Sequence, residues 1–230
     1  MTTSQQAGSH AAGGGLAPDL NDPTLGSLAR AREMASETVK TIADPAPLGL
    51  GAFALTTFLL SMVNSGLIPK STGPVVLGVA LFYGGIVQVL AGMWEFRKGN
   101  TFGALAFSSF GAFWLSFWAY DTMYAGEIAK VNPDDVKTAS GWFLLAWGIF
   151  TVIMVIASLR TTVLLAGLFT ILAITFFLLA FGALAGSATL TKTGGYFGIA
   201  TALWAWLLCL AGVAASTFGR PIIPNRSLAR

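Results

Sequence analysis

From Leu48 to Phe218 the chain is a series of long apolar runs separated by short polar or Pro- and Gly-containing segments. A helix needs about 20 apolar residues to cross the hydrocarbon core of a bilayer. Six runs have about this length and carry no charged residue near their centres: 48–67, 74–95, 102–120, 141–159, 162–186 and 194–217. None alternates apolar with polar residues, as the strands of a membrane β-barrel do. The pattern predicts an all-α membrane protein with six transmembrane helices.

The residues before the first run have a different composition. Met1 to Leu20 is rich in Gly, Ala, Ser and Gln and has no apolar core, which is typical of disorder. Between Thr24 and Ile42 most apolar residues fall on one helical face, which indicates a short helix on the membrane surface or between subunits. We therefore predict an N-terminal tail over 1–43 that is partly disordered, a transmembrane domain over 44–218 and a C-terminal tail over 219–230.

The basic residues predict the orientation in the membrane. Six spans place both termini on one side, and positive charge is enriched on the cytoplasmic side. Nine of the 13 Lys and Arg residues fall on the terminal side, whereas four fall on the other side: Lys70, Lys130, Lys137 and Lys192. That other side also carries the acidic residues of a long loop predicted over 121–140. We expect both tails to be cytoplasmic in a multi-pass plasma-membrane protein.

Composition excludes several classes of function. Only 10% of the residues are charged, against about 25% in ordinary soluble domains, so a soluble enzyme is excluded. The basic residues are scattered over loops, which argues against nucleic acid as a partner. The single histidine, His10, and the single cysteine, Cys209, provide no histidine relay, intrachain disulfide or Cys-based metal site. We expect no catalytic residues, cofactor or metal.

Polar residues within the first two spans are candidates for a solute pathway. Thr56, Thr57 and Asn64 recur on one helical face of the first span, and Gln88 lies deep in the second. An amide buried in hydrocarbon must face protein or water. Gln88 therefore lines a pore or makes a hydrogen bond between helices, and the sequence leaves both open.

Two carboxylates lie at the predicted cytoplasmic ends of the spans. Asp44 precedes Pro45 and Pro47 at the first helix start, where it can accept hydrogen bonds from free amides. Glu95 ends the second span. Because no titratable residue lies in the middle of a span, these two are the candidates for the cytoplasmic mouth and for proton coupling.

A pathway built from amides, hydroxyls and aromatic rings suits a small solute that is neutral or singly charged. A carboxylic acid has a pKa of about 4–5, so it can carry its own proton through such a pathway.

Several blocks, in the same order along the chain, resemble the acetate uptake transporter family, which includes the bacterial succinate–acetate permeases. The first is Asp44-Pro45-Ala46-Pro47-Leu48-Gly49-Leu50, where the family has Asn at the first position. The others include Phe82-Tyr83-Gly84-Gly85-Ile86-Val87-Gln88, Lys98-Gly99-Asn100-Thr101-Phe102-Gly103 and Phe107-Ser108-Ser109-Phe110-Gly111-Ala112-Phe113-Trp114. The resemblance covers about residues 44–224.

The resemblance implies six helices per protomer around a central pore, a hexameric ring, and uptake of acetate or succinate with protons. It implies an apolar constriction at Phe53, Phe110 and Leu172, with Phe110 where the family often has Tyr. Tyr83 and Ser109, from the matched blocks, complete the predicted pathway.

We interpret the chain as a transporter or channel for acetate and similar short carboxylates. Two alternatives remain at this point: a channel for ammonia or another small neutral solute, and a membrane scaffold that transports nothing. A 3+3 inverted repeat is also possible, because a shift of about 95 residues superposes the first three spans on the last three.

Overall fold

The computed structural model describes residues 23–40 and 42–228, which belong to two compact units that divide after Ile42. The first unit contains one described helix, α1 (Pro23–Lys40), where the sequence predicts a short helix. The location of α1 on a membrane surface stays a prediction, as do the boundaries of the two tails. The predicted disorder of Met1 to Leu20 lies outside the described residues.

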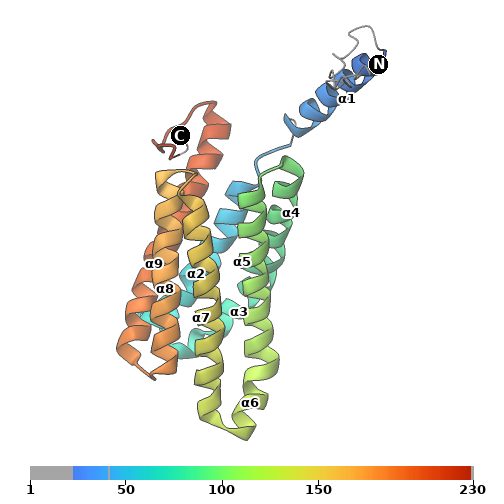
Figure 1. Ribbon diagram of the computed structural model, residues 1–230. Helices are drawn as coiled ribbons and strands as arrows, with labels where there is room; N and C mark the ends of the chain where they lie inside the picture. The colour runs from blue at the N-terminus through green and yellow to red at the C-terminus, as the bar shows by residue number, and fades with distance from the viewer. Residues whose placement is uncertain (1–22, 41, 229–230) are drawn as a thin grey trace, which may run out of the picture. The chain divides into compact units, whose positions relative to one another are not determined.

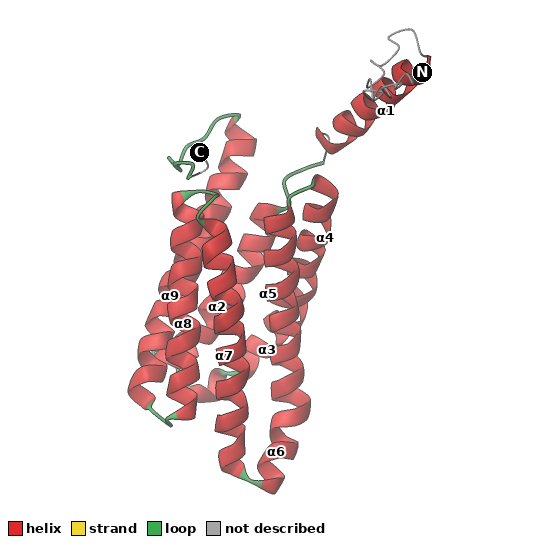
Figure 2. Ribbon diagram, viewed as in Figure 1, coloured by secondary structure: helices red, strands yellow, loops and turns green. Residues whose placement is uncertain are grey.

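The second unit consists of helices joined by short loops, with no named strand among its described residues (Figures 1 and 2). Six of its helical segments are long and apolar enough to cross a membrane: Ala46–Ser65, Lys70–Lys98, Thr101–Val131, Pro133–Ser158, Val163–Leu184 and Ala188–Phe218. Their number and order confirm the six spans predicted from the apolar runs.

Two of these segments are built from several elements each. The second contains a 3₁₀ turn η1 (Lys70–Thr72), α3 (Pro74–Leu81), a π-helical turn η2 (Phe82–Val87) and α4 (Gln88–Lys98). The third contains α5 (Thr101–Ala119), a π-helical turn η3 (Tyr120–Tyr124) and α6 (Ala125–Val131). The other four are α2 (Ala46–Ser65), α7 (Pro133–Ser158), α8 (Val163–Leu184) and α9 (Ala188–Phe218).

The prediction of a long loop over 121–140 is wrong. This stretch is helical on both sides of Asn132, because α6 continues the third span and α7 begins at Pro133. Asn132 caps α7 by accepting a hydrogen bond from the Asp134 N–H at 3.1 Å. Proline in the first turn, and the acidic Asp134 and Asp135 beside the positive helix end, favour a helix start here.

Small residues let the helices approach closely. A Cβ placed on Gly195 of α9 would overlap the backbone N of Ser65 on α2, and one on Gly198 would overlap the Ser61 hydroxyl. A Cβ on Gly92 of α4 would likewise overlap Ser108 of α5. Helices in lipid associate through this kind of close packing, since burial of apolar surface gains little there.

An aromatic cluster fills the centre of the unit. Phe110 of α5 lies with its ring 5.6–6.3 Å, centroid to centroid, from four rings of α7 and α8: Trp147, Phe150, Phe169 and Phe176. The bundle is therefore closed by side chains at this level. The inverted repeat stays a prediction.

Candidate functional site

A cavity of about 190 Å³ penetrates the bundle from the end that carries the turn between α7 and α8. Residues of α2, α4, α5, α8 and α9 line it, together with Asn225 of the C-terminal segment. Its walls are predominantly apolar side chains. Five of the predicted site residues lie on it: Phe53, Gln88, Glu95, Phe110 and Leu172.

Phe53, Phe110 and Leu172 form the inner end of the cavity. Each side chain is buried, and the rings of Phe53 and Phe110 meet edge to face with centroids 6.0 Å apart. Phe53 lies seven residues beyond Ala46 at the mouth, which is a depth of about 10 Å along a helix. The three residues thus come from three helices to one level of the cavity, as a constriction requires. Their role as the constriction stays a prediction.

Gln88 places a buried amide with an unpaired oxygen in the cavity wall. The residue is 1% exposed, and its Oε1 has no hydrogen-bond partner among the described residues. The π-helical turn η2 ends immediately before it, and such turns occur frequently at functional sites. Most buried polar groups are paired, and an unpaired one costs about 1–3 kcal/mol. The interhelical hydrogen bond that the sequence left open for Gln88 is not formed within the described residues.

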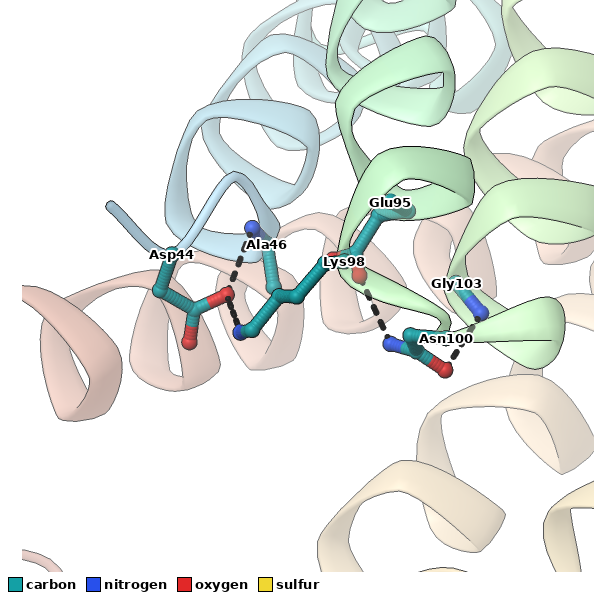
Figure 3. A network of polar contacts seen from close by, with 6 residues as sticks. All are labelled: Asp44, Ala46, Glu95, Lys98, Asn100 and Gly103. Carbon is teal, nitrogen blue, oxygen red and sulfur yellow. Dashed lines mark hydrogen bonds and ion pairs between the residues drawn. The ribbon is translucent and has the colours of Figure 1, made fainter. Parts of the chain in front are cut away.

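Glu95 and Asn100 form a polar pair nearer the mouth (Figure 3). Asn100 Nδ2 donates to Glu95 Oε2 at 2.8 Å, while Asn100 Oδ1 accepts from the Gly103 N–H at 3.1 Å and so caps α5. Glu95 is fully buried, and its Oε1 is left without a partner in the described part of the chain. The cap therefore fixes Asn100, and Asn100 holds Glu95 beside the cavity with one oxygen available.

Asp44 lies at the edge of this network but does not line the cavity. Its Oδ1 accepts from the Ala46 N–H at 3.1 Å and forms an ion pair with Lys98 Nζ at 2.8 Å (Figure 3). The predicted hydrogen bond to the first amides of α2 is therefore formed. The ion pair, which the sequence analysis missed, partly neutralises the extra charge that Asp44 brings to this end.

Thr56, Thr57 and Tyr83 are not among the residues that line the cavity. Thr56 donates to the Ala52 carbonyl at 2.9 Å and packs against Gly84 of η2, so its contacts join two helices. Thr57 is buried with an unpaired hydroxyl, and the Tyr83 hydroxyl lies against Gly51 of α2. The structure does not bring these three residues to the cavity, and Thr56 and Tyr83 contact a neighbouring helix instead.

Ser109 and Asn64 lie in two other depressions. Ser109 borders a cleft between α5 and α7 beside Trp147 and Phe150. Asn64 lines a pocket of about 300 Å³ at the opposite end of the bundle, where three of the four lysines assigned to that side also lie: Lys70, Lys137 and Lys192. The predicted pathway residues are therefore divided: some line the cavity at one end, Asn64 lines the basic pocket at the other, and the remainder line neither.

Two polar residues at the cavity mouth, Thr162 and Asn225, were missed by the sequence analysis. Thr162 caps α8 by accepting from the Leu165 N–H at 3.3 Å, and Asn225 donates to the Thr162 hydroxyl at 3.1 Å. The Thr162 cap can be predicted from the local sequence, because a Thr directly before an apolar run is a common helix start. No local signal identifies Asn225, which is 63 residues away along the chain. The described residues contain no cluster of His, Cys, Asp and Glu that could hold a metal ion.

Six helical segments that are able to span a membrane enclose a mostly apolar cavity, whose wall also carries an amide and a carboxyl group. These features define a polytopic helical membrane protein with an internal cavity. The chain belongs to the GPR1/FUN34/yaaH family, whose model matches residues 26–228. The resemblance predicted from the sequence blocks is thereby confirmed.

Relatives and a solved structure agree with this assignment. The chain is 38% identical over 185 residues to the succinate-acetate/proton symporter SatP of Escherichia coli K12, a match that covers 80% of this chain and 95% of that one. It is 42% identical over 183 residues to the ammonia transport outward protein 2 of Saccharomyces cerevisiae. That match covers 79% of this chain, which spans only 65% of the yeast protein's length.

The structure of the bacterial acetate channel SatP superposes with a TM-score of 0.71 at 36% identity, covering 80% of this chain and 99% of that one. The helical fold is therefore shared with a solved channel.

Proposed function

We propose that the protein transports acetate and similar short carboxylates across the membrane through the cavity between Ala46 and the Phe53–Phe110–Leu172 constriction. The observation that carries this proposal is the buried amide of Gln88, whose Oε1 is unpaired, in a mostly apolar part of the cavity wall. Its Nε2 can donate to a carboxylate, while the surrounding rings contact the methyl group. The relatives named for acetate and succinate support the same solute class.

Glu95 is the candidate for proton coupling. It is a buried carboxyl group beside the cavity with one unpaired oxygen, and a carboxylate that enters next to it raises the cost of keeping Glu95 ionised. A proton bound by Glu95 or carried by the solute removes that repulsion. Asp44 is paired with Lys98 and does not line the cavity, so we assign it to the cytoplasmic mouth and not to proton coupling.

We extend the proposal to the whole molecule. With nine of 13 basic residues on the terminal side, both termini are cytoplasmic and the cavity opens toward the cytoplasm. The basic pocket around Asn64 then faces outward, where three lysines attract an anion. Each protomer carries its own pathway in a homohexamer in the plasma membrane.

The test is entry of labelled acetate into proteoliposomes, with and without an inward proton gradient, against protein-free vesicles. Accumulation above the outside concentration means that acetate and a proton cross together, whereas uptake that ignores the gradient means a passive pore. Absence of uptake beyond the empty vesicles contradicts the proposal and leaves a membrane scaffold as the interpretation.

A second candidate solute is ammonia, which the name of the yeast relative favours. Competition separates the two solutes. Unlabelled propionate and succinate lower the uptake of labelled acetate if the protein selects carboxylates. Methylammonium lowers that uptake if the protein selects ammonia.

A further inference from the structure

The residues after α9 fold back over the bundle instead of leaving it (Figure 1). Helix α9 ends at Phe218 and is capped by Gly219, whose φ of 69° is the left-handed conformation that glycine adopts readily. The following segment, residues 220–228, is called the C-terminal strap below. It runs antiparallel to the turn between α7 and α8, with a bridge between Thr162 and Ser227.

Two backbone hydrogen bonds hold the C-terminal strap to this turn. The Val163 N–H donates to the Arg226 carbonyl at 3.0 Å, and the Leu228 N–H donates to the Thr161 carbonyl at 2.8 Å. The Asn225 side chain adds two more, since its Oδ1 accepts from the Leu164 N–H at 3.3 Å and its Nδ2 donates to Thr162. The strap thereby satisfies the first amides of α8, which have no partner within their own helix.

The same contacts place the C-terminal strap at the cavity mouth. Asn225 and Thr162, which bond to each other, both line the cavity, as Ala46 and Asn100 do. A solute that enters at this end passes the Asn225 amide before it reaches Gln88.

We propose that the C-terminal strap is a gate, which detaches from the turn between α7 and α8 to admit or release the carboxylate, and that Asn225 selects the solute at this mouth. The inference rests on the proposed function. Most strap residues are exposed and none is buried, so the strap opens at a far lower free energy than the transmembrane helices. Detachment removes Asn225 from the mouth and widens it.

A reversible cross-link tests the gate. Thr162 and Ser227 are a non-hydrogen-bonded antiparallel pair, whose Cα atoms lie about 4.5 Å apart, within the range that a disulfide spans. We would combine Thr162→Cys and Ser227→Cys with Cys209→Ser and measure acetate flux in proteoliposomes. We expect oxidation to lower the flux at least fivefold and reduction to restore it to the level of the single variants, which serve as matched controls.

A second variant ends the chain after Gly219. We expect it to fold, because no transmembrane helix is touched, and to transport acetate at least twice as fast with weaker discrimination against larger carboxylates. Unchanged flux in the verified disulfide form, or unchanged flux and selectivity after truncation, would overturn the gate. Wild-type vesicles in the same experiment keep the two proposals apart: if they take up no acetate, the proposed function fails, whereas an unresponsive strap beside active wild type refutes the gate alone.

Discussion

A substitution of Gln88 separates a transport role from a packing role, because its Oε1 has no hydrogen-bond partner within the described residues. We expect Gln88→Leu to lower acetate flux about tenfold, since a hydrogen bond to a charged group contributes about 1.5–3 kcal/mol. We expect unchanged or slightly higher thermal stability, because an unpaired amide is replaced by an apolar side chain of similar size. Flux into proteoliposomes and thermal unfolding in detergent measure the two effects.

The matched control for Gln88 is Thr201→Val. Thr201 is also fully buried, but it donates to the Phe197 carbonyl of its own helix and does not line the cavity. Equal flux in Gln88→Leu and Thr201→Val would contradict the assignment of Gln88 to the solute site.

A substitution of Phe53 tests whether the constriction lies at this residue. We expect Phe53→Ala to raise the flux of succinate relative to acetate severalfold, because the ring that meets Phe110 edge to face is removed. A buried Phe→Ala change costs about 3–5 kcal/mol, so the amount of folded protein is measured alongside. Phe58→Ala is the control, since Phe58 is on the same helix and contacts Trp206 outside the cavity. An unchanged succinate-to-acetate ratio would argue that the constriction lies elsewhere.

At the scale of the element, helices α2 and α9 contact each other through a close approach of their backbones. A Cβ on Gly195 meets the backbone of Ser65, which cannot move aside as a flexible side chain can. We expect Gly195→Ala to destabilise the protein by about 1–3 kcal/mol, which thermal unfolding in detergent detects as a lower Tm.

Gly126 of α6 provides the comparison for Gly195. A Cβ on Gly126 meets nothing within 4 Å, so Gly126→Ala should stabilise α6 slightly through helix propensity. If the Gly195→Ala protein is as stable as the Gly126→Ala protein, α2 and α9 can move apart without any loss of stability.

The two ends of the whole molecule differ in charge, and this predicts its orientation. In a Cys209→Ser background we expect a membrane-impermeant maleimide to label Val131→Cys on intact cells, because Val131 is 87% exposed at the tip of α6. Arg160→Cys, in the turn between α7 and α8, should be labelled only after lysis. The reverse pattern would place the termini outside.

The sequence determined the six helices and the set of polar residues available to the solute. The reason is that a membrane helix satisfies its own backbone, so an apolar run of sufficient length specifies the helix without reference to the rest of the chain. The motif blocks specified the family in the same local way. The helix start within 121–140 was also encoded locally, in Asn132-Pro133-Asp134-Asp135. The polar residues of this stretch were instead interpreted as a loop.

Only the tertiary structure decided which candidates share a site. Phe53 and Asn64 lie on one helical face, but they are 11 positions apart, which corresponds to about 16 Å of helix, so they line cavities that open at opposite ends of the bundle. Gln88, Phe110 and Leu172 meet at one cavity because three separate helices bring them to the same depth. Asn225 reaches that cavity through a chain reversal that no local pattern encodes, since contacts between distant segments depend on how the helices pack.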